Sequence, residues 1–301
     1  MISTHFDLQD SKTINVALEE LRGYWKLWSA CLLSECGLPT LRGIIVTKFY
    51  PKLEEDLRRF MLSVGSPTVL IRHDKRLESP PHPRGGFLVG QSLLLATIKH
   101  FFALDRIVAV YETADPLLNM HSVNVLFESN QEAYVEVVGP GFDASDLQRG
   151  DITPHESFSM SLTVEGEIAS RRLIRRVDQK TYDESVRTRK EKIMTKLETS
   201  PTHDLARKIR MDLGILDDLD AHLRKMDSPL CRFQNYQPVS ESLLRDTITK
   251  IVKSRIISRF SELTGAKFPM NFSTSLVNRG SKQVFWDIVS PALKFEGLNN
   301  R

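Results

Sequence analysis

The sequence has few cysteines and none in the arrangement of a zinc site. The 301 residues include three, Cys31, Cys36 and Cys231. Cys31 and Cys36 are accompanied neither by a second cysteine pair nor by a histidine cluster, which excludes the usual zinc-binding patterns. We therefore expect structural thiols in a reducing compartment.

Long apolar runs are also missing. No uninterrupted run approaches the length that crosses a membrane, and residues 1–10 lack a basic segment followed by an apolar core. These absences predict a cytoplasmic protein without a membrane partner.

Charge of one sign is not in large excess. The 41 Lys and Arg residues against 38 Asp and Glu give a net charge of +3, too little for strong whole-molecule attraction to nucleic acid or lipid. No RNP, KH or zinc-finger signature occurs. Basic stretches such as residues 171–176 and 187–192 are offset by acidic ones and are interpreted as solvated helix faces. Nucleic acid is therefore not an expected partner.

What is present is the composition of a soluble globular chain, 41% hydrophobic and 26% charged, long enough for two domains. Apolar residues at steps of three and four predict helices, and alternating or short apolar runs predict strands. The predicted helices cover residues 12–36, 51–62, 182–197, 203–226 and 239–263. The predicted strands cover residues 43–47, 69–71, 107–111, 122–127, 133–138, 158–164 and 168–177, and the tail after 267 contains further strand-like runs.

The centre of the chain, residues 107–151, holds the most informative pattern. The strands 122–127 and 133–138 are joined by a polar tetrad and predict an antiparallel hairpin. Because strand side chains alternate, Tyr134, Glu136 and Val138 share one sheet face. A carboxylate in this apolar strand packs poorly but is a good metal ligand, so Glu136 is a candidate metal site.

A second pattern indicates phosphate binding. The strand around residue 70 delivers Arg72 and Lys75 into a loop that ends in Arg84, Gly85 and Gly86. Backbone N–H groups of a glycine loop can converge on phosphate oxygens, while Arg and Lys neutralise the charge. A common turn is the alternative reading of the glycine pair.

Taken in order, these segments resemble the ATP-grasp superfamily. They are Gly37, Leu38 and Pro39 before the strand at 44–46, the strand 69–72, the glycine loop 84–89, the strand 107–112, the strand 122–125 and the strand 135–137. The resemblance covers roughly residues 35–142.

The resemblance implies an α+β fold in which two mixed or antiparallel sheets sandwich ATP, with a mainly helical C-terminal region. It implies adenine against Val110 and Tyr111, ribose near Glu112, phosphates at Arg72, Lys75, Arg84, Gly85 and Gly86, and Mg²⁺ at Glu136. The expected division is residues 1–106 for a small lobe, 107–178 for a metal-binding lobe and 179–301 for the helical region.

The metal motif departs from the superfamily pattern. The usual Glu-x-Asn-x-Arg ending is absent after Glu136, and Asn124 stands where Asp is commoner, supplying an oxygen without a charge. Glu128, Asp143 and Asp146 are substitute ligands, since Mg²⁺ takes oxygen ligands and often only one or two carboxylates plus phosphates. A site with impaired catalysis is the alternative.

The loop at residues 139–151 is expected to act at the site. It combines glycines and aspartates with Arg149, which is assigned, with Arg84, to catalysis at the γ-phosphate or the acceptor carboxylate. A solvated connection is its other reading. Four histidines, His73, His82, His121 and His155, lie near these loops without metal-ligand spacing.

Three functions remain open from sequence. The first is an ATP- and Mg²⁺-dependent ligase that activates a carboxylate as an acyl phosphate for attack by an amine or thiol, or a related phosphotransferase, acting on a small-molecule or peptide acceptor. The second is a nucleotide sensor without turnover. The third is a nucleic-acid-associated factor using the basic C-terminal helices, and a homo-oligomer is an open possibility for each.

Overall fold

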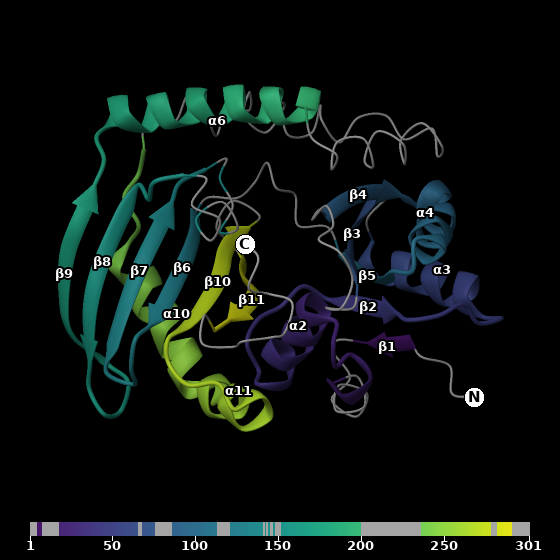
Figure 1. The fold of residues 1–301 in the computed structure, drawn as a ribbon, viewed down its shortest axis with the longest axis horizontal. Coiled ribbons are helices and arrows are strands. Elements are labelled where there is room, and N and C mark those ends of the chain that lie inside the picture. The colour runs from purple at the N-terminus through teal and green to yellow at the C-terminus, as the bar shows by residue number, and fades with distance from the viewer. Residues whose placement is uncertain are drawn as a thin grey trace.

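The chain forms two antiparallel β-sheets with helices on their faces (Figure 1). The structure is a computed structural model, and it describes residues 5–7, 18–65, 68–75, 86–112, 121–140, 142, 144, 147, 152–199, 236–277 and 282–290. The five-stranded sheet is called sheet A and the six-stranded sheet is called sheet B. This is the α+β arrangement of two sheets that the sequence predicts.

Sheet A has the strand order β1-β2-β5-β3-β4. Its strands are β1 (His5–Asp7), β2 (Gly43–Val46), β3 (Thr68–Asp74), β4 (Gly86–Gly90) and β5 (Ile107–Glu112). β5 pairs with both β2 and β3. The boundary expected between residues 106 and 107 is therefore not where the sheets divide, because β5 completes sheet A rather than starting sheet B.

The outer face of sheet A is covered by helices α3 (Leu53–Val64) and α4 (Gln91–Ala103). Alternate strand residues such as Ile71 and Val110 pack with them in one apolar cluster. Helix α4 is not among the helices expected from the sequence, although its buried residues Leu94, Thr97, Ile98 and Phe101 have helical spacing. Because apolar residues occur on all sides of this segment, its helical periodicity is hard to recognise from the sequence.

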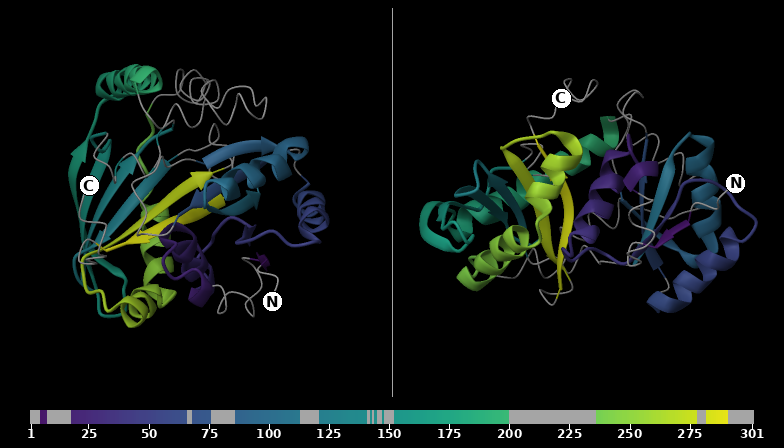
Figure 2. Two further views of the ribbon diagram at one scale, coloured as in Figure 1. Left: turned by 45° about the vertical axis from the view of Figure 1, so that its right-hand side comes forward. Right: turned by 90° about the horizontal axis from the view of Figure 1, so that it is seen from below.

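The face of sheet A opposite to α3 and α4 is called its inner face. It packs against α2 (Trp25–Glu35), which lies between sheet A and β11 (Figure 2). The helix predicted over residues 12–36 is interrupted: residues 18–20 are helical, Gly23 adopts a φ of 103°, and α2 begins only at Trp25. Residues 12–17 of that prediction lie outside the described ranges. Asp74, at the end of β3, accepts hydrogen bonds from the backbone N–H groups of Lys26 (2.8 Å) and Leu27 (3.3 Å). A carboxylate from a distant strand thus caps the start of α2.

Sheet B has the strand order β11-β10-β6-β7-β8-β9. Its strands are β6 (His121–Phe127), β7 (Glu132–Val138), β8 (Glu156–Leu162), β9 (Ile168–Arg176), β10 (Met270–Val277) and β11 (Lys282–Val289). The antiparallel hairpin predicted around residue 130 is confirmed as β6 and β7. The C-terminal region contributes β10 and β11 to this sheet, so it is not purely a helical appendage.

Two helices, α10 (Glu241–Lys253) and α11 (Ile256–Thr264), follow one another on one side of sheet B, where their buried side chains join the apolar cluster of the sheet. The single long helix predicted over 239–263 is wrong, because Arg255 takes the left-handed φ of 59 and breaks it. The buried apolar stripe continues across the break through Ile256 and Phe260, which is why periodicity alone suggested one helix.

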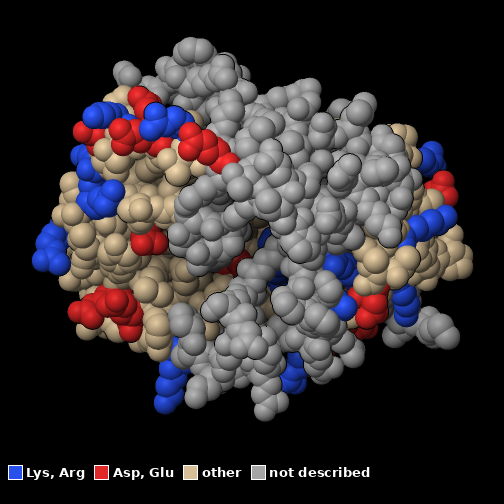
Figure 3. Space-filling model, turned by 45° about the horizontal axis from the view of Figure 1, so that its top comes forward, with Lys and Arg blue, Asp and Glu red and all other residues tan. Residues whose placement is uncertain are grey.

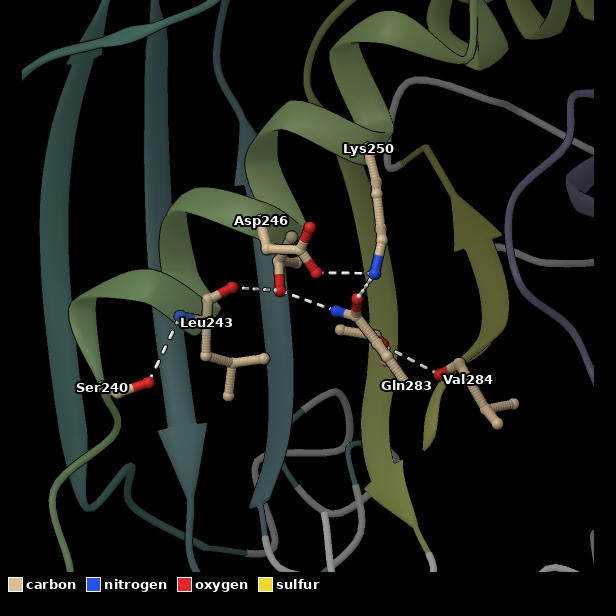
Figure 4. Close-up of polar contacts among 8 residues, drawn as sticks. Ser240, Leu243, Asp246, Lys250, Gln283 and Val284 are labelled. Atoms are coloured by element: carbon tan, nitrogen blue, oxygen red, sulfur yellow. Dashed lines mark hydrogen bonds and ion pairs between the residues drawn. The ribbon is translucent and has the colours of Figure 1, made fainter. Parts of the chain in front are cut away.

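Polar contacts fix α10 on the sheet (Figure 4). Ser240 caps its start by accepting from the Leu243 N–H (3.2 Å). Gln283 of β11 donates to the Thr247 hydroxyl (2.6 Å) and accepts from Lys250 Nζ (2.8 Å). These bonds join α10 to β11, an edge strand of sheet B, and fix the orientation of the helix.

Helix α6 (Gln179–Thr199) follows β9 directly and runs along one end of sheet B (Figure 1). Tyr182, in its first turn, is buried in a small cluster with Val138, Phe142 and Leu147. Within the described ranges no helix is both long and apolar enough to cross a bilayer.

Candidate functional site

The two faces of sheet B differ in chemistry, and the face away from α10 carries polar side chains in register. We call this the inner face. One cross-strand row on it, here called the central row, consists of Asp287, Ser273, Asn124, Glu136, Ser157 and Arg175, from β11 through to β9. Directly opposed residues of antiparallel strands point to the same side of a sheet. The structure therefore gathers six polar residues that are far apart in the sequence.

Glu136 lies at the middle of the central row. It is half-buried, between Asn124 on β6 and Ser157 on β8. Burial raises the pKa of its carboxyl group above the ordinary value. No hydrogen bond or ion pair joins it to another residue of the described ranges. It is thus a carboxylate that has lost part of its hydration without gaining a partner there.

Asn124, the other predicted metal ligand on this row, is buried and already engaged. Its Oδ1 accepts a hydrogen bond from the Ser273 hydroxyl (2.9 Å), and its Nδ2 donates to the Ala144 carbonyl (3.3 Å). These bonds hold the amide oxygen on the inner face beside Glu136. One lone pair of that oxygen remains available for a further contact.

Glu128 lies beyond the end of β6, at the turn of the hairpin. Four residues of strand, about 13 Å at the usual rise, separate it from Asn124. The structure therefore does not bring Glu128 to the metal position proposed at Glu136. Across the described residues no group of three His, Cys, Asp or Glu side chains is arranged to hold a metal. Mg²⁺ fits only where phosphate oxygens and water complete a set begun by Glu136 and Asn124.

Arg72 lies on the inner side of sheet A and reaches toward sheet B. Its Nη1 donates to the Trp286 carbonyl of β11 (3.5 Å). The neighbouring Asp287 is half-buried. Desolvation raises the pKa of its carboxyl group, while the charge of Arg72 opposes that rise. Asp287 also accepts a hydrogen bond from Ser29 of α2 (2.6 Å). Arg72 therefore links sheet A to sheet B, and Asp287, the first residue of the central row, links sheet B to α2.

The glycine loop ends beside Arg72. Gly86 is the first residue of β4, and the strand register places it directly opposite Arg72. Lys75 follows β3, where its backbone N–H donates to Asp74 (2.9 Å). Arg84, Gly85 and Arg149, together with Asp143 and Asp146, lie outside the described residues. The described part of the predicted phosphate site thus consists of Arg72, Gly86 and Lys75.

The three residues predicted to hold the nucleoside have different environments. Val110 points into the outer core of sheet A with α3 and α4, whereas Tyr111 faces inward and its buried hydroxyl has no partner within the described ranges. Burial raises the pKa of that hydroxyl. Glu112, at the end of β5, forms an ion pair with Lys282 and accepts from the Arg42 N–H (3.1 Å). A ribose would have to displace or join these contacts.

The described histidines serve packing. His73 stacks on Phe101 and bonds Arg106 (3.0 Å), and His121 bonds the Gln237 carbonyl (2.9 Å). His155 accepts from the Gly139 N–H (3.0 Å) and contacts Ser185 Oγ through its other ring nitrogen (2.8 Å). His121 is near enough to His155 to help lower the pKa of that ring, but the three belong to no group of three metal-ligating side chains among the described residues. His82 lies outside the described residues.

Sequence reasoning missed Ser273 and Asp287. Asp287 follows the same rule that drew attention to Glu136, since it is an acidic residue inside the apolar run of β11. That signal could have found it. Ser273 has no such signal, because a serine in a strand is common and only the pairing of β10 with β6 gives it a role.

Comparison with known proteins gives matches in structure alone. No family model and no curated protein matches the sequence. The D-alanine-D-alanine ligase from Coxiella burnetii is similar over 91% of this chain and 49% of its own, with 8% identity and a TM-score of 0.40. The D-cycloserine synthetase DcsG is similar over 95% of this chain and 67% of its own, with 9% identity and a TM-score of 0.41.

A third similar structure is the N5-carboxyaminoimidazole ribonucleotide synthetase from Thermotoga maritima. It matches over 93% of this chain and 44% of its own, with 12% identity and a TM-score of 0.35. These structural neighbours are ATP-grasp enzymes, the superfamily that the order of motifs resembles. The chain spans about half the length of the first of them. At these low values the likeness concerns the arrangement of elements and assigns no activity to this chain.

Proposed function

We propose that this protein binds ATP between the inner faces of sheets A and B and uses it in ligase-type chemistry on a carboxylate. The observation that carries the proposal is the central row, in which the Glu136 carboxylate is half-buried without a described partner. Desolvated carboxylates without a structural partner are characteristic of functional sites. Arg72 and Gly86 lie side by side on sheet A, the sheet that carries the phosphate loop in this proposal.

In this proposal the phosphates are held by Arg72, Lys75, Gly86 and the neighbouring Arg84 and Gly85. Tyr111 and the backbone at Val110 contact adenine, and Glu112 contacts the ribose. Glu136 and the Asn124 amide oxygen hold Mg²⁺ together with phosphate oxygens. The bound metal supplies neutralisation of charge on the transferring phosphoryl group.

The residues of the chain would then act by orientation and charge. A carboxylate oxygen of the acceptor attacks the γ-phosphorus, and the bond to the β–γ bridging oxygen breaks with its electron pair going to ADP. Arg72, Arg84 and Arg149 stabilise the equatorial oxygens, because fixed cations aimed at developing charge lower the barrier. An amine or thiol then displaces phosphate from the acyl phosphate and loses its proton.

A second candidate is nucleotide binding without turnover. One specific feature favours it: Arg72 already bonds β11 and Glu112 already pairs with Lys282, so two predicted nucleotide ligands have internal partners. Binding would exchange these contacts for nucleotide contacts, which suits a sensor that changes conformation.

The variant Glu136→Gln separates the two candidates. The amide keeps an oxygen but loses the charge that holds the metal, so we expect ATP binding to be substantially retained and carboxylate-dependent phosphate release to be abolished. Glu132→Gln is the matched control, since Glu132 is an exposed carboxylate on the same strand. Thermal-shift titration with ATP measures binding, and phosphate release measures turnover.

The outcomes discriminate clearly. Wild-type turnover in Glu136→Gln removes Glu136 from the mechanism. ATP binding by a wild-type protein that releases no phosphate with any carboxylate supports the sensor. An absence of ATP binding by the wild type contradicts both candidates.

Arg72 provides an independent test of where the phosphates bind. Arg72→Ala is expected to weaken ATP binding about ten- to a hundredfold, the cost of one charged hydrogen bond. Because Arg72 also bonds β11, a circular-dichroism melt must first establish that the variant folds. A folded Arg72→Ala that binds ATP like the wild type places the phosphates elsewhere.

A further inference from the structure

Four arginines lie on the edge strand β9, and its register divides them between the two faces of sheet B. Arg171 and Arg176 point to the face that carries α10. Arg171 pairs with Glu241 (3.4 Å) and lies over the Phe158 ring (5.3 Å to the centroid). Arg176 Nε donates to the fully buried Glu156 (2.7 Å). These two arginines hold structural positions.

Arg172 and Arg175 point to the inner face. Arg172 is directly opposite Ser159, and Arg175 is directly opposite Ser157. The bulge at Ile174 lets both arginines share this face although they are three residues apart. Both are exposed, and neither forms an ion pair with another described residue. Basic side chains gather at the left edge of Figure 3, where β9 and the start of α6 lie.

Arg172 and Arg175 lie on the same face of sheet B as Glu136, two strands away from it. Arg175, Ser157 and Glu136 are consecutive members of the central row on β9, β8 and β7. Two strand spacings put the Cα atoms of Arg175 and Glu136 about 10 Å apart, and the rows of Arg172 and Arg175 are about 7 Å apart along β8. An arginine side chain at Arg175 is long enough to span the intervening row position of Ser157 and approach a ligand held at Glu136.

We propose that Arg172 and Arg175, with the Ser157 and Ser159 hydroxyls, form the acceptor subsite and that it takes a small dicarboxylate. This inference rests on the proposed function. One carboxylate of the acceptor is held by the two arginines, whose planar donors fit a carboxylate in a two-pronged contact. The second carboxylate extends along the central row to Glu136. There an oxygen of this second acceptor carboxylate attacks the γ-phosphorus. The bond from that phosphorus to the β–γ bridging oxygen breaks, and ADP leaves with its electron pair.

Arginines on an edge strand also prevent that edge from pairing with another chain. That role requires charge alone, and lysine fulfils it equally well. It gives no reason for the serine hydroxyls opposite these two arginines or for the alignment with Glu136. Lysine substitution therefore separates protection of the edge from binding of a carboxylate.

The test is calorimetric titration of the full chain with glutarate, a dicarboxylate of five carbons, and with its uncharged diamide. Titrations are made with and without Mg²⁺ and a non-hydrolysable ATP analogue. We expect the wild type to bind glutarate and not the diamide. The double variant Arg172→Lys with Arg175→Lys is expected to bind glutarate about ten- to a hundredfold more weakly. Arg171→Lys, on the opposite face, is the matched control and should bind like the wild type.

Two results overturn the subsite. One is an absence of glutarate binding by the wild type both with and without the nucleotide analogue. The other is wild-type affinity in a double variant whose melting temperature is unchanged. Failure of the ATP analogue to bind, with arginine-dependent glutarate binding intact, contradicts the proposed function and leaves the subsite standing. Binding of the analogue without binding of glutarate contradicts the subsite and leaves the proposed function standing.

Discussion

Glu136 and Glu156 lie on adjacent strands of sheet B, on opposite faces, and their surroundings differ completely. Glu156, on the face toward α10, is fully buried and accepts from Arg176 (2.7 Å) and from the Val239 N–H (2.6 Å). Glu136, on the inner face, is half-buried without a described partner. One sheet therefore separates two tasks: one face holds the fold together, and the other keeps a carboxylate available.

One cross-strand row on each face shows the same division. The row Phe272, Val125, Val135, Phe158 and Leu173 on the helix side is apolar, and four of its five members are buried. The central row on the inner side contains only polar residues. An apolar row contributes through burial, whereas a buried polar row costs stability unless it is hydrogen-bonded. We therefore expect substitutions on the two faces to differ in their effect on unfolding.

The largest expected effect lies on the helix face. Phe272→Ala removes a fully buried ring that packs edge-on against Phe127, with centroids 5.7 Å apart. Loss of such a ring costs about 3–5 kcal/mol in the free energy of unfolding, because a cavity remains. Urea denaturation followed by circular dichroism measures it. A loss below about 1 kcal/mol would mean that this face does not hold the core together.

The next effect is a pH dependence at the end of the inner face. Burial lowers the pKa of His155 to about 3, and the neighbouring Arg175 and His121 add to the shift. Both ring nitrogens are engaged in the fold, one with the Gly139 N–H and the other with Ser185. The neutral ring is then the folded form, and below the unfolded pKa of about 6.5 only the unfolded chain takes up a proton. Stability contributed by neutral His155 is present above pH 6.5 and falls by about 3 kcal/mol by pH 4.

Urea midpoints at pH 7, 5.5 and 4 measure this slope. His155→Gln cannot titrate, so it should be less stable than the wild type at pH 7 and should lose less stability toward pH 4. Carboxylates titrate in both proteins and cancel in the difference. Parallel pH profiles of wild type and variant would show that His155 titrates normally in the folded protein.

A smaller effect is expected at Glu156. Glu156→Gln keeps the shape but removes the charge that accepts from Arg176 and the Val239 N–H, and we expect a loss of about 1–3 kcal/mol. Because Val239 lies just before α10, the start of that helix should also show faster hydrogen exchange. Exchange at the amides of residues 241–244 distinguishes this local effect from general destabilisation.

The smallest effect is expected at Glu136, and it has the opposite sign. Burial raises the pKa of its carboxyl group, so the folded state disfavours the charge above the unfolded pKa. Glu136→Gln should therefore leave stability unchanged at pH 4 and raise it slightly at pH 8, by less than about 1 kcal/mol because the residue is half-exposed. A clear loss at pH 8 would mean that Glu136 has a structural partner.

Much of the fold follows from local pattern. The hairpin of β6 and β7 has alternation and a polar turn, and α3 and α10 have clean apolar stripes. The sequence misleads where a stripe continues through a change of direction, as at Arg255, or where apolar residues surround a helix, as in α4. Periodicity reports which side is buried, and it does not report where the backbone breaks.

The residues of the candidate site were proposed from local sequence pattern. Glu136 was found because a charge interrupts an apolar strand, and Arg72 because a basic residue precedes a glycine loop. Their roles remain predictions, whereas Glu128 is held away from Glu136 by the rise of β6. Asn124 was proposed as an oxygen ligand, and its bonds to Ser273 and Ala144 depend on partners distant in sequence.

The sequence by itself determined most of the strands, the sheet face of Glu136 and the order of segments that resembles the ATP-grasp superfamily. It could do so because strand alternation and turn chemistry are local properties. Only the tertiary structure decided that β5 belongs to sheet A, that Arg72 reaches β11, and that two of four neighbouring arginines share a sheet face with Glu136. Strand order and register depend on which strands pair, and a single strand carries no record of its neighbours.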